Sequence, residues 1–551
     1  MLLLLDGGAT AQHSGNEHEM VILGVADGRD AGAALVVGAK TVSLRLQERF
    51  DRIPRSDAFP WEAIEQVLVD GGVRREQVDV VAVAGRITPP LIVRRHRGLR
   101  SFAQDPFSAV LDAQVARDGF LRQSGLAALE SDAAAEFFNE AFVQRGFNPR
   151  RVVMVDQHRA LAAAAYRTQP ESDAIVVSLH GRGDGVGLAV HRGRSGQLEQ
   201  ILSQAGISAV HLHLDRCRAV LGLHGQPHAD LSALGARGSI DEHLVAELHQ
   251  VWGVDRGIIE RRSLRLRGQT ASPWKQLAAA PREVAAASIM AHLRECVLGL
   301  IQGHLEQQRT STVIVAGSML ADPRIVASIA HAGATVYTPP VPGFTALPLG
   351  AALAQAGSAP ADVSTALWAP QVTAVPPDSA VPFTASRMAE RLHAGHAIAR
   401  FVGGHPGCPW GGGSRSVWVA GHNKTAIRAR LRLPGWAEPA VIALPRTIEV
   451  EDRPRLAGPL GHGSAAIRPL RSPVPTLADG RLHLREVARD ETEMQAVLRA
   501  LAQRGAPPVA MIWPLREARQ PIVATADRAI DLWRRAHLDA LQVGRHWVER
   551  S

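Results

Sequence analysis

The amino-acid sequence predicts a multidomain α/β protein, and three observations lead to this prediction. The chain has 551 residues, whereas a single hydrophobic core rarely grows beyond about 250–300 residues. Short apolar runs of strand length alternate with amphipathic helical segments, which is the pattern of layered α/β folds. Hydrophobic residues make up 46% of the chain and charged residues 21%, a composition typical of soluble globular proteins that excludes wholesale disorder.

The first part of the chain predicts an α/β unit that opens with a strand meander. Its predicted elements are, in order, strands over 21–25, 33–37 and up to about 47–49, a helix over 60–69, a strand over 78–83, a helical region over about 105–145, a strand over 152–155, a helix over 160–166, and strands over 174–179 and 186–190 around a glycine turn. A helix-dense region over about 240–308, a strand over 312–315 and a strand–turn–helix unit over 336–355 follow. In α/β folds, short buried strands that run into glycine turns are where ligands bind.

The composition changes after residue 356. From 357 to 384 the chain is rich in proline, alanine, serine and threonine with weak periodicity, which predicts a linker. A second α/β unit follows, with helices predicted over 385–394, about 491–504 and from 527, and strands over 397–402, 482–487 and 509–512. We therefore expect an N-terminal extension over 1–19, a first domain over 20–356, a linker over 357–384 and a second domain over 385–551. The start of translation is left open between Met1 and Met20.

The net charge does not predict a nucleic-acid partner. The chain carries a formal charge of +8, but its only lysines are Lys40, Lys275 and Lys424, and its arginines are scattered rather than gathered in a stripe with aromatic residues. No window reaches the ~20 apolar residues of a membrane helix, and no signal peptide is recognisable. We therefore expect a cytoplasmic protein with neither nucleic acid nor membrane as a partner.

The cysteines predict neither disulfides nor a zinc ribbon. The chain has 3 cysteines, Cys217, Cys296 and Cys408, which are far apart in the sequence and odd in number. This count excludes a disulfide framework and a CxxC zinc site and fits a reducing compartment.

Several short patches occur in a fixed order over about residues 20–535. In the first domain they are Ile22-Leu23-Gly24, Asp30-Ala31-Gly32-Ala33-Ala34-Leu35, Glu48-Arg49-Phe50-Asp51-Arg52-Ile53, Asp156-Gln157-His158-Arg159-Ala160-Leu161-Ala162-Ala163, Gly183-Asp184-Gly185, Ala316-Gly317-Ser318, Pro342-Gly343 and Gly350-Ala351-Ala352-Leu353. In the second domain they are Gly413-Ser414-Arg415-Ser416, Asp479-Gly480 and Pro521-Ile522-Val523. Through these patches the chain resembles the O-carbamoyltransferase family of the nodulation and antibiotic-tailoring type.

The resemblance implies an actin-like ATPase-fold (ASKHA) domain followed by a smaller YrdC-like α/β domain. In such enzymes the YrdC-like domain joins carbamoyl phosphate and ATP into carbamoyladenylate and releases pyrophosphate. The ASKHA domain, which carries a metal ion, then passes the carbamoyl group to a substrate hydroxyl. For an active member, the resemblance therefore implies ATP and carbamoyl phosphate as co-substrates and a small-molecule acceptor.

The chain departs from the family at polar positions of the first domain. The two metal-binding histidines, one helical turn apart, are Gln157 and Leu161 here, and only the neighbouring His158 remains. Leucine cannot bind a metal. The chain has His180 and Phe344 where the family has aspartates. It has Ala321 where the family has an asparagine and Arg29 where the family has a histidine. These replacements predict that the family's metal site has been lost.

The second domain retains only part of its anion-binding elements. A long family motif is shortened to Gly411-Gly412-Gly413-Ser414-Arg415-Ser416, in which glycine amides and one guanidinium could still hold a phosphate. A second family motif corresponds here to the basic run Arg428, Arg430 and Arg432, which could bind an anion. The alternative is that this run is an exposed basic strand without a ligand. A third motif has become Ile512-Trp513-Pro514-Leu515-Arg516, a change that argues against an intact nucleotide pocket.

Other isolated features predict no site. His211 and His213 alternate on an expected strand, but zinc needs more than two ligands. The turn over 181–187 lacks the lysine and hydroxyl residue of a Walker loop. For Cys408, a buried structural thiol is preferred over a reactive one.

The candidate residues follow from the retained patches. For catalysis they are His158, His180, Asp184 and Asp30, and for phosphate or nucleotide binding they are Gly183, Gly185, Gly317, Ser318, Gly413, Arg415, Ser416, Arg428, Arg430 and Arg432. No metal ligand is assigned.

The preferred hypothesis is a degenerate carbamoyltransferase-family protein, non-catalytic or dependent on an intact paralogue or a second copy, in natural-product or glycan tailoring. The first alternative is an active O-carbamoyltransferase or a diverted adenylate-using transferase, which would need a rebuilt metal site around His158, His180 and Asp184. The second alternative is an actin-like nucleotide-binding switch without group transfer.

Overall fold

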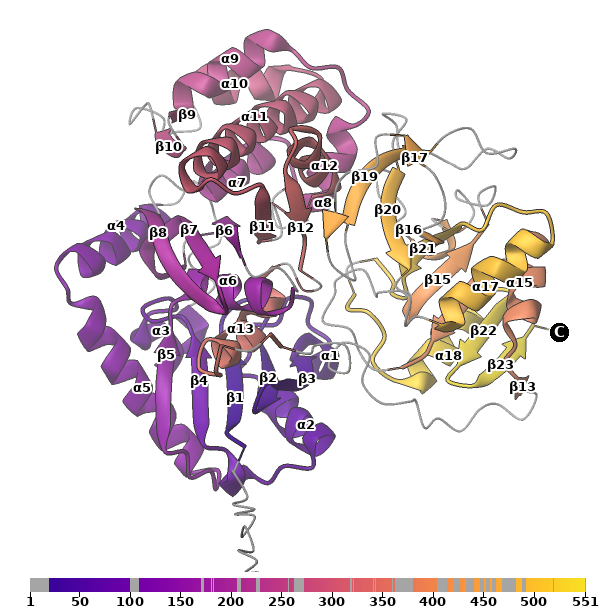
Figure 1. The fold of residues 1–551 in the computed structure, drawn as a ribbon, viewed down its shortest axis with the longest axis horizontal. Helices are drawn as coiled ribbons and strands as arrows, with labels where there is room; N and C mark the ends of the chain where they lie inside the picture. Colours follow the sequence, from indigo (N-terminus) through magenta and orange to yellow (C-terminus); the bar gives the residue numbers. More distant parts are fainter. Residues whose placement is uncertain are drawn as a thin grey trace, which may run out of the picture.

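A computed structural model of the chain shows two α/β regions side by side, with a mainly helical region above the first in the view of Figure 1. The described residues are 19–99, 109–169, 173–179, 181, 183–205, 210–223, 228–255, 257–261, 272–317, 320, 322–339, 341, 343–358, 360–361, 380–403, 414–420, 427, 429–432, 441–445, 450–451, 456–457, 462–467, 482–487, 492–518 and 520–550. The α/β fold class predicted from the sequence is confirmed.

The first sheet contains the predicted meander. Its antiparallel strands are β1 (Val21–Ala26), β2 (Gly32–Val37) and β3 (Lys40–Leu46), and β4 (Val80–Ala84) and β5 (Arg151–Val155) add in parallel on the other side of β1. The strand order is β3-β2-β1-β4-β5. Alternate residues of β1 face opposite ways, so Leu23 packs in the core with α2 (Trp61–Gly71) and α5 (Ala127–Val143), whereas Ile22 packs in the core on the other face.

The second sheet repeats this topology. Strands β6 (Asp173–Leu179), β7 (Val186–Arg194) and β8 (Gln197–Ala205) form an antiparallel meander, and β11 (Thr312–Ala316) and β12 (Thr335–Tyr337) add in parallel to β6. The order from the meander outward is β8-β7-β6-β11-β12, which matches that of the first sheet strand for strand. The chain therefore contains two copies of one supersecondary unit.

Two helices lie between the sheets, α6 (Gln157–Arg167) and α13 (Leu347–Leu353). Their residues share one apolar core with the inner faces of both sheets. The helices approach closely, since a Cβ atom added to Gly350 would lie 1.8 Å from the carbonyl oxygen of Ala160. The alanine-rich sequence of α6 and the glycine of α13 therefore serve helix–helix and helix–sheet packing.

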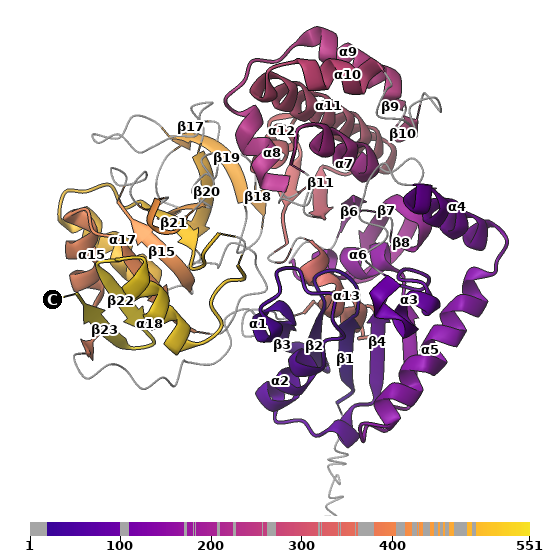
Figure 2. The ribbon, with the colours of Figure 1, turned by 180° about the vertical axis from the view of Figure 1, so that it is seen from behind.

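The helical region covers the outer face of the second sheet (Figures 1 and 2). Its helices are α7 (Val210–Val220), α8 (His228–Gly235), α9 (Glu242–Val251), α10 (Ser272–Ala279), α11 (Arg282–Gln308) and α12 (Pro323–His331). In length and composition α11 is apolar enough to cross a membrane, contrary to the sequence prediction, but 67% of its apolar window is buried inside the structure. It therefore packs here as a core helix.

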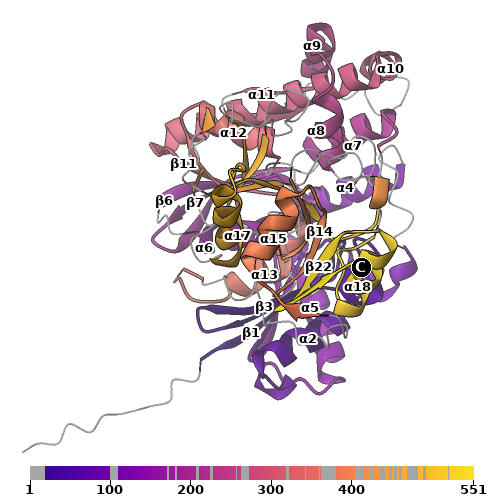
Figure 3. The same cartoon turned by 90° about the vertical axis from the view of Figure 1, so that its right-hand side faces the viewer.

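The second α/β region is built on a sheet with ten described strands. They are β13 (Val381–Pro382), β14 (Ile398–Phe401), β15 (Arg415–Val419), β16 (Val441–Pro445), β17 (Val450–Glu451), β19 (His462–Ile467), β20 (Leu482–Val487), β21 (Ala510–Pro514), β22 (Ala540–Val543) and β23 (His546–Glu549). Helices α15 (Ala385–His393) and α17 (Thr492–Gln503) pack on one face and α18 (Ala526–Arg535) on the other, as Figure 3 shows from the side.

The two regions are joined by more than the chain between them. Strand β18 (Leu456–Ala457) pairs in parallel with β12, so a strand from the second half extends the second sheet. Nη1 of Arg49 also donates a hydrogen bond to the carbonyl oxygen of Ile522 over 3.1 Å. These contacts bring residues of the second region next to the second sheet and next to Arg49, which follows β3.

Three details of the predicted secondary structure need correction. The helical region predicted over 105–145 is two described helices, α4 (Ala109–Gln123) and α5, because Gly125 adopts a positive φ of 77° between them. The helix-dense region also contains an antiparallel hairpin, β9 (Trp252–Asp255) and β10 (Ile258–Arg261). His211 and His213 lie in α7 and not on a strand, so they point to different sides of a helix.

Candidate functional site

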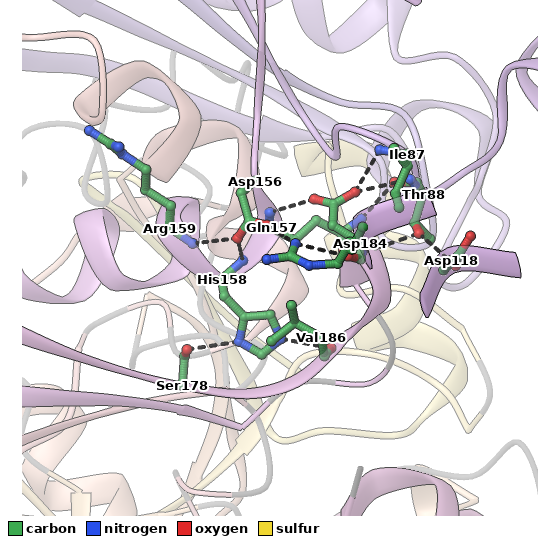
Figure 4. A network of polar contacts seen from close by, with 11 residues as sticks. Ile87, Thr88, Asp118, Asp156, Gln157, His158, Arg159, Ser178, Asp184 and Val186 are labelled. Atoms are coloured by element: carbon green, nitrogen blue, oxygen red, sulfur yellow. Dashed lines mark hydrogen bonds and ion pairs between the residues drawn. The ribbon is translucent and has the colours of Figure 1, made fainter. Parts of the chain in front are cut away.

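The N-terminus of α6 is the centre of a polar network (Figure 4). Oδ1 of Asp156 accepts hydrogen bonds from the backbone N–H groups of His158 at 2.9 Å and Arg159 at 3.1 Å. Its Oδ2 lies 3.2 Å from Nη1 of Arg122 in α4. Capping by Asp156 starts the helix three residues earlier than the apolar pattern predicts.

Asp184, in the turn between β6 and β7, connects this turn to the network through its carboxylate. Its Oδ1 accepts hydrogen bonds from the backbone N–H groups of Ile87 at 2.8 Å and Thr88 at 3.0 Å, and its Oδ2 accepts one from that of Gln157 at 2.8 Å. Burial, and then the charge of Asp156, raises the pKa of Asp184 to about 6, while the backbone donors act in the opposite direction. This carboxyl group is the common acceptor for three backbone donors.

His158 is fully buried beneath the turn. Its Nε2 lies 3.0 Å from the carbonyl oxygen of Val186, and its Nδ1 lies 2.8 Å from Oγ of Ser178. A carbonyl can only accept, so we assign the ring proton to Nε2. The Ser178 hydroxyl has one proton and two acceptors, Nδ1 of His158 and the carbonyl oxygen of Ala189 at 3.1 Å. Burial lowers the pKa of His158, which agrees with this neutral form.

The family's metal ion does not fit at α6. Leu161 is 1% exposed in the apolar core between the sheets, and Nε2 of Gln157 donates to the carbonyl oxygen of Thr88 over 2.8 Å. Both ring nitrogens of His158 face protein atoms. Phe344, at the position of a family aspartate, contributes a phenyl ring close to Gly181. We call this set of interlocked residues, Asp156, Gln157, His158, Asp184 and Thr88, the α6 brace.

The predicted glycines of the first domain serve close packing. A Cβ atom on Gly183 would lie 2.3 Å from Oε1 of Gln157, and one on Gly317, which has φ of 107°, would lie 2.0 Å from the carbonyl oxygen of Leu179. Gly185 also has a positive φ, 73°. Protein atoms therefore occupy the space beside these glycines, and two of the turns require glycine for their backbone conformation.

Asp30 marks a second polar region, at the end of β1. It has a positive φ of 60° and is partly buried. Burial raises the pKa of Asp30, against the opposing charges of Arg29 and Arg55. Burial, followed by the charge of Arg29, lowers the pKa of Arg55 to about 10, so this guanidinium remains charged at neutral pH.

The region around Asp30 and Arg55 collects arginines from three parts of the chain. Arg55 interacts electrostatically with Arg29, with Arg218 of α7 and with Arg516, which follows β21. Asp30 interacts with Arg49 as well. We call Arg29, Arg49, Arg55, Arg218, Arg415 and Arg516 the arginine junction. It joins the first sheet, the helical region and the second α/β region.

Asp215 and His211 lie at the α7 side of the junction. Nδ1 of His211 lies 3.0 Å from Oδ2 of Asp215, and Nη1 of Arg218 lies 3.3 Å from its Oδ1. Burial acts to raise the pKa of Asp215, but His211, Arg218 and Arg29 outweigh it and hold this pKa far below its ordinary value. Asp215 is therefore ionised and offsets part of the positive charge.

Arg415 belongs to the same junction from the second region. Burial, together with the charges of Arg45 and Arg49, lowers the pKa of Arg415 to about 9. Its guanidinium stacks 3.3 Å from the ring centre of Phe401, and Nη2 donates to the carbonyl oxygen of Gly403 over 2.9 Å. Among the described residues, Nε and Nη1 of Arg415 have no hydrogen-bond partner although the side chain is 5% exposed. Two buried donors of one cation are thus available to an anion.

The structure brings only some of the predicted site residues together. Asp30 and Arg415 both interact with Arg49, whereas His158 and Asp184 belong to the α6 brace. Oγ of Ser416 accepts from Nε1 of Trp418 over 2.8 Å. Arg430 and Arg432 are exposed, with Nη1 of Arg430 3.7 Å from Oδ2 of Asp539. His180, Ser318, Gly413 and Arg428 lie outside the described residues.

Sequence reasoning missed most of the arginine junction. It treated Arg29 as the loss of a histidine and the stretch ending in Arg516 as the loss of polar groups, yet both arginines interact with Arg55. A signal was present, because Arg29 directly precedes a retained patch, Arg516 ends an altered motif, and both side chains are basic. Arg218, in α7, had no such signal.

No protein-family model matches the chain, and no curated protein sequence matches it significantly. Among solved structures it is similar to full-length HypF in a phosphate- and nucleotide-bound form, with 12% sequence identity and a TM-score of 0.32. The match covers 62% of this chain and 47% of that protein, so the chain spans about half the length of HypF. This similarity is too low to establish a common fold.

Proposed function

We propose that this chain is a degenerate member of the O-carbamoyltransferase family that binds a phosphate-bearing ligand at the arginine junction. The observation that carries the proposal is Arg415, a buried cation with two available donors beside Arg45 and Arg49. Guanidinium groups bind phosphate through charge-assisted, often bidentate, hydrogen bonds. Three acids, Asp30, Glu48 and Asp215, accompany the six junction arginines in the charge interactions described, so arginines outnumber acids among the described partners.

The repeated strand order supports an actin-like first domain. Two sheets with the same order and a helix pair between them form a layered core of the kind expected for an ASKHA fold. Arg29, Asp30 and Arg55 lie at or beyond the ends of strands in the first of these sheets, and Arg218 lies in the helical region covering the second. A ligand at the junction would therefore contact both repeats.

The α6 brace supports loss of metal-dependent transfer. A carbamoyl transfer that used the family's metal would need ligands at positions 157 and 161, and this chain offers an amide held by Thr88 and a core leucine. No step through such a metal is assigned. Binding without this chemistry suits a protein that supports an intact paralogue or a second copy of itself in a cytoplasmic tailoring pathway.

An active transferase is the second candidate, because the anion-binding residues of both halves lie in one junction. In that case the junction would hold carbamoyl phosphate and ATP while the second region forms carbamoyladenylate. Water would first hydrolyse carbamoyl phosphate to carbamate and inorganic phosphate. A carbamate oxygen would then attack the α-phosphorus of ATP, the bond from that phosphorus to the bridging oxygen would break, and pyrophosphate would leave.

ATP–pyrophosphate exchange by the full-length protein, with and without carbamoyl phosphate, separates the two candidates. The degenerate reading predicts that carbamoyl phosphate or ATP binds and that no exchange occurs. Exchange that depends on carbamoyl phosphate and is lost in Arg516→Ala would establish the active reading instead. A protein that binds neither ligand while its circular dichroism shows it folded would contradict both.

A matched pair of variants tests the binding site itself. Arg516→Ala removes one partly buried junction arginine and should weaken phosphate binding about 10- to 100-fold, since a hydrogen bond to a charged group contributes roughly 1.5–3 kcal/mol. Arg194→Ala removes an exposed arginine outside the junction and should leave binding unchanged. Equal affinities for the two variants would contradict the assignment.

A further inference from the structure

Three metal-binding side chains meet in the helical region, away from the α6 brace. They are His249 near the end of α9 and His292 and Cys296 in α11. One ligand atom from each residue lies within 4.8 Å of the other two. Figure 1 shows α9 and α11 together at the top of the molecule, and α6 between the two sheets below.

The spacing in α11 directs two of these side chains to one point. His292 and Cys296 are four residues apart and therefore lie on the same face of the helix. Nε2 of His292 is 3.9 Å from Sγ of Cys296, and both side chains are buried, with 1% and 2% of their surface exposed. A separation of one turn in a helix lets both side chains reach a common ion.

His249 completes the cluster from the neighbouring helix. Its ring lies 4.3 Å from that of His292, at nearly a right angle. Oε2 of Glu295 lies 2.8 Å from Nε2 of His249, and this carboxylate is half exposed. A carboxylate on the far nitrogen of a metal-binding histidine fixes the ring and its tautomer.

Among the described residues of the cluster, His249 is the one exposed to solvent. His249 is 34% exposed at its side chain, whereas Trp252 covers the buried His292 with a ring-centre distance of 4.1 Å. An ion can therefore enter beside His249 and would be shielded on the inner side by an indole ring.

We propose that His249, His292 and Cys296 bind a zinc ion, with Glu295 orienting His249 and water in the fourth position. Two imidazoles and one thiolate form a donor set that suits zinc rather than magnesium or calcium. On binding, Sγ of Cys296 forms a bond to zinc and its proton leaves to solvent. Ligand atoms around tetrahedral zinc are roughly 3.3–3.7 Å apart, given bonds of about 2.0–2.3 Å, so side-chain rotations that contract the cluster suffice.

The zinc ion would tie α9 to α11 beside the β9–β10 hairpin. This is a binding site independent of the arginine junction, with no residue in common, so its failure and that of the phosphate proposal are distinguishable. Because a metal that binds only the folded state stabilises that state, zinc should raise the unfolding temperature of the protein.

Cobalt(II) is the probe that identifies the ligands. The chain has 23 histidines, so metal content alone would not separate this site from surface binding. A thiolate bound to cobalt gives a near-ultraviolet charge-transfer band that histidine sites lack. We expect one equivalent of cobalt to produce this band in the metal-stripped full chain, and one equivalent of zinc to abolish it.

Cysteine variants assign the band to one residue. The Cys217→Ser/Cys408→Ser variant, which keeps Cys296 alone, should retain the band, and Cys296→Ser should lose it. Glu295→Gln should weaken zinc binding about 10- to 100-fold, the range for partners of metal ligands, and His249→Gln should weaken it more.

Three results would overturn the proposal. They are a folded wild-type protein without the band, a band that persists in Cys296→Ser, and zinc affinity unchanged in His249→Gln. The last variant changes a partly exposed side chain, so it decides the question even where Cys296→Ser fails to fold. Zinc that raises the unfolding temperature of wild type and not that of His249→Gln would support the site.

Discussion

The α6 brace and the arginine junction differ in how far their polar groups are paired with one another. In the brace, the carboxylate of Asp184 is matched by three backbone donors and both nitrogens of His158 face protein acceptors or hydroxyls. In the junction, arginines from three parts of the chain lie near Asp30 and Asp215, and no described residue accepts a hydrogen bond from Nε or Nη1 of the buried Arg415. A region whose polar groups satisfy one another holds a fold together, whereas a buried cation with donors that no described residue accepts is suited to a ligand of opposite charge.

The two regions also differ in what their residues do at positions where the resembled family has other side chains. Gln157 and Leu161 stand where the resembled family has metal ligands, and here they pair or pack inside the protein. Arg29 and Arg516 stand where the resembled family has other side chains, and both interact electrostatically with Arg55. The brace residues therefore serve interior packing, whereas Arg29 and Arg516 add positive charge to the junction.

The largest expected effect is at the brace. Asp184→Ala removes the acceptor of three backbone donors, each worth roughly 1–3 kcal/mol when left unpaired, so the free energy of unfolding should fall by about 3–9 kcal/mol. Urea unfolding measures this change. Asp322→Ala, which removes an ordinary helix cap at α12, should cost only about 1 kcal/mol. If the two variants lose equal stability, the brace is not the interlocked unit described.

The second effect is a pH dependence beside the brace. Burial, and then His158, lowers the pKa of His191 from 6.5 to about 4. Unfolding lets this ring take up a proton, so the free energy of unfolding should fall as the pH drops from 6.5 towards 4, by about 3 kcal/mol in all.

His191→Gln isolates this contribution. The raised pKa of Asp184 has the opposite effect between pH 3.8 and about 6, so the slope is read as the difference between wild type and variant in urea unfolding at a series of pH values. The variant should lose stability less steeply with acid than wild type. Parallel curves would contradict a buried, neutral His191.

The third expected effect, at Arg55, changes phosphate affinity and leaves stability nearly unchanged. Arg55→Ala should weaken phosphate binding about tenfold or more, because a charged donor contributes roughly 1.5–3 kcal/mol, while the free energy of unfolding stays within about 0.5 kcal/mol of wild type or rises as like-charge repulsion is relieved. Calorimetric titration with phosphate and urea unfolding test the two parts. Lost stability with unchanged affinity would make Arg55 a structural residue like those of the brace.

The smallest effect distinguishes two roles for Asp30. Asp30→Asn keeps a residue that tolerates the positive φ of 60° and removes one negative charge from the junction. Phosphate affinity should rise a few-fold, on the order of 0.5–1 kcal/mol. A fall in affinity would show that Asp30 contacts the ligand or holds an arginine in position.

Much of the fold could be predicted from local sequence pattern. The meander from Val21, the strands around 80 and 175, and the helices after the linker all carry clear periodicity, and the structure confirms them. The β9–β10 hairpin was missed because its strands have four residues each inside a helical context. The pairing of β18 with β12 joins residues about 120 positions apart, which no local pattern encodes.

The candidate site was less predictable than the fold. The sequence identified Arg415 and Asp30, but their shared neighbour Arg49 became apparent only when the two regions were placed together. His158 was chosen as a surviving histidine, and its partners Ser178 and Val186 lie 20 and 28 residues further along the chain. Motif comparison shows which residue types are present, whereas the tertiary structure decides which of their polar groups remain available to a ligand.

The most direct test of the central claim is calorimetric titration of the folded, full-length protein with carbamoyl phosphate, before and after treatment with a chelator. The account predicts saturable binding that chelation leaves unchanged and that Arg516→Ala weakens at least tenfold, in line with the loss of one charge-assisted hydrogen bond. Binding that disappears on chelation and returns with added metal, or that is unaffected in Arg516→Ala, would contradict it.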